Sequence, residues 1–148
     1  MSLEDLIAIE EIKQLKARYF RCMDTKDWAG LTDVFAPDAE LDMSGEMGEG
    51  AEPGVGVTRG QAEIGAFMKA AVEHIVTVHH GHMPEITITS PTTATGIWSM
   101  EDKLRWPDGQ EMHGYGHYHE TYEKVDGAWK IKTETLTRLR RDFGPALG

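Results

Sequence analysis

The sequence predicts an α+β protein in which helices come first and strands follow. Helical periodicity fills the first third of the chain, whereas residues 75–139 are rich in Thr, Ile, Val, Tyr and Trp and are divided by turn signals. A chain of 148 residues suits one domain, which we assign to residues 1–148. Helices that precede an antiparallel sheet in this way are expected to pack on one of its faces.

The N-terminal segment is expected to form a long amphipathic helix. Its apolar positions recur at spacings of three and four, which is one helical face: Leu3, Leu6, Ile9, Ile12, Leu15, Tyr19 and Met23. Ser2 and Asp5 form a predicted capping pair at its start. Asp27 is expected to cap a second, short helix that runs through Phe35 and stops at Pro37.

The segment after these helices is expected to be a short strand, residues 39–43, and then a mobile loop, residues 44–60. The loop contains six glycines and one proline, more than a packed element tolerates. Loops of this length in a compact domain are often functional lids, and an idle loop is the alternative. Helical periodicity resumes over residues 61–74, where Phe67 and Met68 are apolar.

The rest of the chain is expected to form antiparallel strands joined by tight turns. The predicted strands are residues 75–78, 86–89, 93–106, 111–125 and 128–139. The turn signals between them are Ser90-Pro91, Pro107-Asp108-Gly109 and Asp126-Gly127.

Composition excludes several classes of partner. The formal net charge is −10 and the sequence pI is about 5.1, which argues against nucleic acid and anionic membrane, since both need a basic face. No apolar run reaches the roughly 18 residues of a membrane helix, and the N-terminus is unlike a signal peptide, so we expect a cytoplasmic protein. The single cysteine, Cys22, permits no intrachain disulfide and is expected to be a buried hydrophobe.

Polar side chains gather in the segment HGYGHYH, residues 113–119. Alternate residues of a strand share a face, which places His113, Tyr115, His117 and His119 together. The opposite face, Met112, Gly114, Gly116 and Tyr118, offers few side chains to pack. We therefore predict that His113, Tyr115 and His117 point inward and line a partly polar cavity.

A second inward-facing set is predicted on the preceding strand. Trp98, Met100 and Asp102 share a face, and a carboxyl in such a place is costly unless it is paired. An inward aspartate beside inward histidines supports proton transfer. With Phe67 as further apolar wall, the cavity favours a small, mostly apolar, ring-bearing substrate.

Two other functions are open at this stage. His117, His119 and Glu123 have an HxH…E spacing that suits Fe, Mn or Zn, although the long N-terminal helices disfavour that class of metal protein and we expect no metal site. A non-catalytic small-molecule-binding domain is the other alternative. Asp24, near the end of the first helix, and His79, in VHHGH, are two further polar groups, and a long separation between them would favour this binding function.

The order of several motifs resembles a known family over almost the whole chain. RYFRCMDTKDW and LTDVFAPDAELDM are followed by the glycine-rich loop, RGQAEIGAFM, VHHGH and TYEKVDGAWKIKTETL. This is similar to the SnoaL-like branch of the nuclear-transport-factor-2-like superfamily. The resemblance implies a cystatin-like cone, in which N-terminal helices pack into a strongly curved mixed, mainly antiparallel sheet that encloses a pocket. It is weak on function, because such folds host many chemistries.

The resemblance also implies an activity and its residues. It suggests dehydratases and dehydrochlorinases, which are cofactor-free lyases, typically homotrimers, built around a His–Asp pair. Asp24 matches the aspartate of that pair, His79 the general base, Tyr19 a pocket tyrosine and Asp102 a pocket acid. We expect a dehydratase-like lyase or isomerase without a cofactor, acting on a small molecule and forming a homo-oligomer, a trimer or dimer.

One expected departure from the family concerns a fixed cation. When the motifs are matched, His113 takes a position near that of an arginine in the dehydrochlorinase, where this cation helps a halide to leave. Loss of the cation is expected to disfavour dehalogenation. Whether Arg138 or Arg140 reaches the pocket from the last strand is open.

Overall fold

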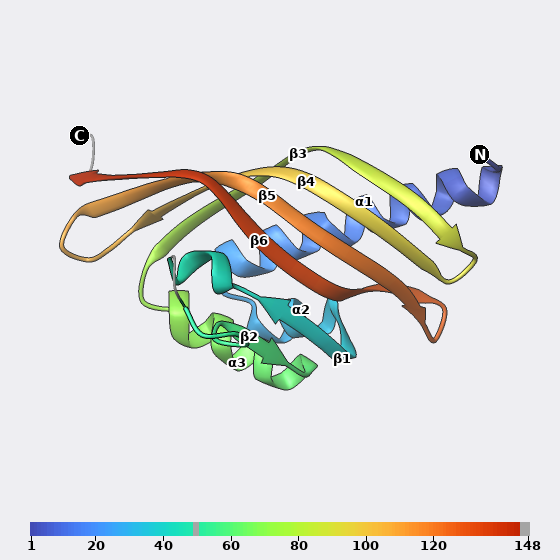
Figure 1. Ribbon diagram of the computed structural model, residues 1–148, viewed down its shortest axis with the longest axis horizontal. Coiled ribbons are helices and arrows are strands. Elements are labelled where there is room, and N and C mark those ends of the chain that lie inside the picture. Colours follow the sequence, from blue (N-terminus) through green and yellow to red (C-terminus); the bar gives the residue numbers. More distant parts are fainter. Residues whose placement is uncertain (49–50, 146–148) are drawn as a thin grey trace.

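Helices lie under a curved six-stranded sheet in the computed structural model, which describes residues 1–48 and 51–145 (Figure 1). The helices are α1 (Leu3–Asp24), α2 (Trp28–Asp33) and α3 (Gln61–Val72), with a 3₁₀ turn, η1 (Ser44–Glu46). The strands are β1 (Phe35–Asp42), β2 (Val57–Arg59), β3 (Val76–Ser90), β4 (Thr93–Arg105), β5 (Gln110–Val125) and β6 (Ala128–Pro145). Their order is β2-β1-β6-β5-β4-β3, and the β1–β6 pair is parallel while the other pairs are antiparallel. The predicted α+β class with a mixed, mainly antiparallel sheet is confirmed.

Helix α1 begins at the predicted capping pair. The backbone N–H of Asp5 donates to Oγ of Ser2 at 3.1 Å, and the backbone N–H of Ser2 donates to Oδ2 of Asp5 at 3.0 Å. This capping box satisfies two N–H groups that the helix start leaves without partners. The helix buries a stripe that contains Ile12, Leu15 and Tyr19, as its periodicity predicts.

The second helix is shorter than predicted, because β1 begins earlier. Helix α2 ends at Asp33, and Phe35 already pairs with Ile131 of β6. Pro37 lies inside β1, where the pairing register shifts between Phe35 and Glu40. A proline is tolerated at such an irregularity because it has no N–H to contribute to the ladder.

The glycine-rich segment is more structured than the predicted loop. It contains η1 and the short strand β2, whose Arg59 pairs with Glu40 of β1. Residues 49 and 50 lie outside the described residues. The expectation of a structureless loop over residues 44–60 is therefore wrong for its two ends.

The two predicted strands over residues 75–89 are one continuous strand, β3. Its pairing with β4 shifts between His82 and Glu85, next to Pro84, which explains the break in the sequence pattern. The predicted turn at Asp126-Gly127 is present, with φ of 51° and 81°, the left-handed values of a tight hairpin turn.

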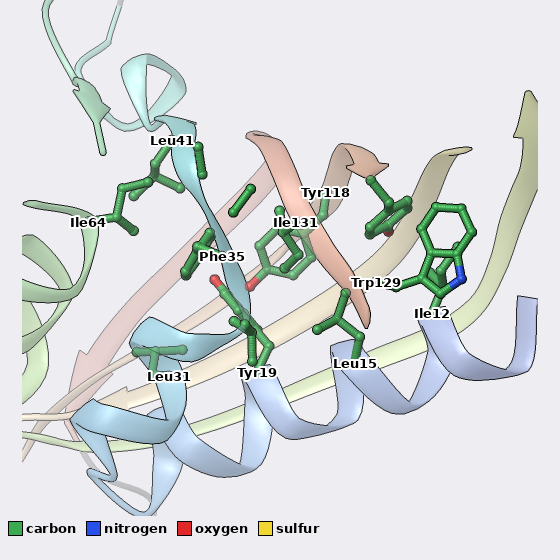
Figure 2. Close-up of a cluster of buried hydrophobic side chains, with 14 of the residues drawn as sticks. Ile12, Leu15, Tyr19, Leu31, Phe35, Leu41, Ile64, Tyr118, Trp129 and Ile131 are labelled. Carbon is green, nitrogen blue, oxygen red and sulfur yellow. The ribbon is translucent and has the colours of Figure 1, made fainter. Parts of the chain in front are cut away.

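The hydrophobic core fills the space between the helices and the concave face of the sheet. Figure 2 shows Ile12, Leu15 and Tyr19 of α1 beside Tyr118 and Ile131 of the sheet. Among the helices that the described residues form, none has the length and apolarity to cross a membrane.

Candidate active site

Asp24 and His79 lie in contact, although 54 residues separate them along the chain. Oδ1 of Asp24, at the end of α1, is 2.7 Å from Nδ1 of His79, on β3. The backbone N–H of His79 donates to Oδ2 of the same carboxylate at 2.8 Å. Two bonds to one residue fix both the position of the carboxylate and the plane of the imidazole.

The ionisation of Asp24 determines the tautomer of His79. Burial would raise the pKa of Asp24, but hydrogen bonds from the ring and backbone of His79 and from Thr77 outweigh it, so the pKa lies below its ordinary value. An ionised carboxylate only accepts hydrogen bonds, so Nδ1 of His79 carries the hydrogen. The other ring nitrogen, Nε2, then presents its lone pair as a base.

Neighbouring side chains hold this pair in place. Oγ1 of Thr77 donates to Oδ1 of Asp24 at 2.8 Å, and Nζ of Lys26 donates to the same hydroxyl at 3.1 Å. The ring of Phe20 lies nearly parallel to the imidazole, with an interplanar angle of 17° and ring centroids 6.4 Å apart. His79 is 8% exposed at its side chain, so the base is largely shielded from water.

His79 borders a small, mainly apolar cavity of about 150 Å³. Its wall combines side chains from α1, α3, the β1–η1 segment and the sheet: Tyr19, Met23, Met43, Glu46, Phe67, Met68, Ala71, Val72, His79, Asp102, Leu104, Met112, Tyr118, Leu136 and Arg138. An apolar cavity of roughly this size accepts a benzene ring in another protein. The space therefore suits a single ring or a compound of similar size.

A buried ion pair lies in the wall beside His79, because Asp102 of β4 is the register partner of His79 across the β3–β4 ladder. Nη1 and Nη2 of Arg138 donate to the two carboxylate oxygens of Asp102 at 2.6 and 3.0 Å. Nε of Arg138 donates to Glu46 at 2.5 Å, and Arg141 donates to the same carboxylate at 3.0 Å. Burial lowers the pKa of Arg138, but its bonds to Asp102 and Glu46 more than offset this, so its pKa lies above its ordinary value.

Arg138 answers the open question about a cation in the pocket. It borders the cavity, whereas Arg140 lies over the ring of Tyr115, 4.9 Å from its centroid, and pairs with Asp142. The expectation that the pocket lacks a fixed cation is therefore wrong. The expectation was wrong because it placed the family's arginine at the position of His113 on β5, whereas the cation of this pocket, Arg138, lies on β6.

Tyr19 lies in the cavity wall, as predicted, but its hydroxyl is hydrogen-bonded to a buried carboxylate on the side away from the cavity. It donates to Oε2 of Glu134 at 2.9 Å, and Glu134 also accepts from Lys16 at 2.9 Å. Lys16, Glu120 and Glu134 were missed in the sequence. A signal was present, because Lys16 lies within the apolar stripe of α1, four residues after Ile12.

The predicted inward face of β5 is wrong. His113, Tyr115 and His117 are partly exposed and His119 is exposed, while the alternate residues Met112, Gly114, Gly116 and Tyr118 are buried. The glycines face inward because the space is already filled. A Cβ on Gly114 would overlap Asp102 and Arg138, and one on Gly116 would overlap the carbonyl of Thr137.

The other predicted wall residues divide into two groups. Phe67 borders the cavity with 40% of its surface exposed, and Asp102 borders it as part of the ion pair. Trp98 and Met100 point inward as predicted but belong to the core beside the cavity, not to its wall. Nε1 of Trp98 donates to the hydroxyl of Tyr122 at 2.9 Å.

The HxH…E residues do not form a metal site. His117 and His119 lie on the outer face of β5 with ring centroids 6.3 Å apart, and His119 bonds Thr137 at 3.0 Å. Within residues 1–48 and 51–145, no group of three His, Cys, Asp or Glu side chains has an arrangement that could hold a metal ion.

The helices, curved sheet and enclosed pocket define the nuclear-transport-factor-2-like fold. Within that fold the chain belongs to the SnoaL-like family: the SnoaL-like domain matches residues 4–135. A "Probable cyclase" from Gibberella zeae is 25% identical over 139 residues, which cover 86% of this chain and 89% of that protein.

Two solved structures have similar folds at low identity. The "Putative Scytalone Dehydratase" from Novosphingobium aromaticivorans has a TM-score of 0.84 and 22% identity, covering 96% of this chain and 91% of that one. The hexachlorocyclohexane dehydrochlorinase from Novosphingobium barchaimii has a TM-score of 0.80 and 20% identity, covering 99% and 94%. At these sequence identities the similarity shows a shared fold alone.

Proposed function

We propose that this protein is a cofactor-free lyase that eliminates water from a small, largely apolar cyclic substrate. The observation that carries the proposal is the 2.7 Å contact between Asp24 and Nδ1 of His79 at the wall of an apolar cavity. A short, oriented contact of this kind is what a general base requires and what a simple binding pocket does not.

His79 would remove a carbon-bound proton through Nε2. Asp24 holds the ring in the tautomer that leaves Nε2 unprotonated, and it stabilises the imidazolium that forms. Positioned general bases contribute about 10²–10⁴-fold to rate. A weak base such as imidazole needs an acidified C–H bond, so we favour a substrate with a carbonyl group beside that carbon.

Arg138, which is bonded to the register partner of His79, would bind the oxygens of the substrate. Arg138 keeps its charge because Asp102 and Glu46 pair with it, and a guanidinium has five N–H donors. It can therefore stabilise negative charge on a carbonyl or a departing oxygen. Tyr19 is the second candidate donor, and it would protonate the departing hydroxyl.

The experiment is a turnover assay on single-ring β-hydroxyketones, followed by the ultraviolet absorbance of the conjugated enone that loss of water produces. We expect turnover by the wild type and loss of at least about 10²-fold in kcat in His79→Ala. The matched control is His117→Ala, which removes the same ring from the outer face of the sheet and should keep full activity. Wild-type turnover that persists in a folded His79→Ala variant would reject the general-base role.

A further expectation is self-association. The resemblance implies a homotrimer or dimer, and light scattering on the eluted protein measures its mass directly. A monomer at micromolar concentration would contradict that expectation without affecting the chemistry proposed for His79.

A further inference from the structure

A fully buried charged cluster lies directly behind the cavity wall, and the proposed mechanism does not use it. Lys16 of α1, Glu120 of β5 and Glu134 of β6 each have side chains that are 0% exposed. Nζ of Lys16 donates to Glu120 at 2.6 Å and to Glu134 at 2.9 Å. The two glutamates are direct register partners across the β5–β6 ladder.

One cation between two carboxylates favours retention of one proton. If both glutamates were ionised, the core would hold an uncompensated negative charge, which is costly in a medium of low dielectric constant. Burial, partly offset by Lys16, raises the pKa of Glu120 to about 8. Burial acts in the same direction on Glu134, but Lys16 and the hydrogen bonds outweigh it and lower its pKa. At neutral pH the shared proton therefore resides on Glu120.

The two carboxylates have matching surroundings, so the proton has two sites. Glu120 accepts from Lys16 and from the hydroxyl of Tyr122 at 2.6 Å. Glu134 accepts from Lys16 and from the hydroxyl of Tyr19 at 2.9 Å. Each glutamate thus has one cationic and one phenolic donor ready to stabilise its ionised form.

Of the two phenols bonded to the glutamates, only that of Tyr19 belongs to a residue of the cavity wall. Which glutamate holds the shared proton can therefore affect the cavity. Tyr19 borders the cavity, whereas Tyr122 does not and instead accepts from Trp98. Tyr118 of β5 also faces the cluster, since Nζ of Lys16 lies 3.7 Å from the centroid of its ring.

We propose that the proton shared by Glu120 and Glu134 sets the direction of the Tyr19 hydroxyl. With the proton on Glu120, Glu134 is an ionised acceptor and the Tyr19 hydroxyl points away from the cavity, as observed. With the proton on Glu134, that carboxyl donates to the Tyr19 oxygen, and the Tyr19 hydroxyl turns toward the cavity. The buried cluster is then the proton source behind the cavity acid.

This inference rests on the proposed elimination of water, in which each proton and electron pair has a defined donor and acceptor. His79 takes the carbon-bound proton, the C–H electron pair forms the new C=C bond, and the C–O bond breaks. Before this step the shared proton passes from Glu120 to its register partner Glu134. The departing oxygen then takes the proton of Tyr19 and leaves as water, while Tyr19 takes the proton of Glu134. Solvent later returns a proton to the cluster, and His79 releases one.

The first test needs no substrate. Infrared spectroscopy of protein with isotope-labelled glutamate reports protonated carboxyl groups by their C=O stretching band. We expect a band at pH 7 that disappears with a midpoint near pH 8. The band should be absent in Glu120→Gln and unchanged in Glu123→Gln, which makes the same change on the outer face of β5. A wild-type protein with no protonated glutamate at pH 7 would overturn the proposal.

The second test reads the direction of the Tyr19 hydroxyl with cyclohexanone as the probe. A hydrogen bond to its carbonyl shifts the C=O stretch to lower frequency. In Glu134→Gln the amide donates to Tyr19, so the shift should exceed that in wild type. In Glu120→Gln, where Glu134 stays ionised as in the wild type at neutral pH, the shift should match that of wild type, and Tyr19→Phe should abolish the Tyr19 contribution. Equal shifts in the two glutamine variants would overturn the proposal. Neither readout depends on turnover, so failure of the His79 assay leaves both tests valid.

Discussion

Both faces of strand β5 carry polar side chains, but those on the inner face are buried and those on the outer face are partly or fully exposed. The inner face presents Tyr118, Glu120 and Tyr122, all buried, while the outer face presents His117 and His119 beside threonines. The comparison shows that a polar residue type says little about function until its face is known. The inner groups are buried, whereas the outer histidines are partly or fully exposed.

The inner face differs from the outer one in its glycines as well. Gly114 and Gly116 face inward because the neighbouring strands deliver larger groups, Asp102 with Arg138 and the backbone of Thr137, into the same space. A glycine on a buried face is therefore a mark of close approach rather than of an empty face. The following predictions test how strongly the two faces differ, beginning with the largest expected effect.

Lys16→Met should destabilise the protein by about 3–5 kcal/mol, because it leaves the ionised carboxylate of Glu134 buried without its cation. Urea unfolding followed by circular dichroism measures the loss. The control is Lys13→Met, an exposed position on the same helix that pairs with Glu10, where we expect less than about 0.5 kcal/mol. A loss below about 1 kcal/mol for Lys16→Met would show that the cluster readily takes up protons or water.

Gly116→Ala should cost about 1–3 kcal/mol, the range for an extra methyl in a close-packed site. The new Cβ would overlap the carbonyl oxygen of Thr137, so the β5–β6 ladder must shift at its bulge. Thermal unfolding of this variant beside the wild type measures the effect. An unchanged melting temperature would mean that the ladder adjusts freely at this point.

Glu120→Gln should change how stability depends on pH. The folded-state pKa of Glu120 is raised to about 8, so between its unfolded value near 4.5 and pH 8 the folded protein binds more protons than the unfolded chain. Stability conferred by that proton falls as the pH rises through this window, by at most about 1.4 kcal/mol per pH unit. Removing the ionisable group should flatten this decline, while Glu123→Gln should not. Parallel pH profiles for Glu120→Gln and wild type would contradict the assignment.

His117→Ala should have the smallest effect, less than about 0.5 kcal/mol, since the ring lies on the outer face of the sheet. Melting temperature and any turnover should match those of the wild type. A large loss of stability at the concentrations where the protein self-associates would instead indicate that this face is covered by a second copy of the chain.

Local rules in the sequence anticipated most of the secondary structure. The spacing of Ile12, Leu15 and Tyr19 predicted α1, Ser2 and Asp5 predicted its start, and Asp126-Gly127 predicted the last hairpin. Errors occurred where a long-range pairing overrode a local signal. Phe35 joined β1 through its partner Ile131 despite the nearby proline, and β3 continued past Pro84 because β4 pairs on both sides of it.

The candidate site was less accessible to such rules. Asp24 and His79 are far apart in the chain, and only the resemblance of their motifs to a family linked them before the structure placed them 2.7 Å apart. Arg138 was left open because nothing local indicates whether a residue of β6 turns inward at a bulge.

The sequence by itself determined where the chain forms helices and strands, because periodicity, capping and turn chemistry act over a few residues. It also determined that β5 has two faces of different chemistry. Only the tertiary structure decided which face is inside, since that depends on what α1, β4 and β6 bring to the same space. Lys16, Glu120 and Glu134 form a cluster for the same reason: three elements distant in sequence bury their charges at one point, where each is stable only in the presence of the others.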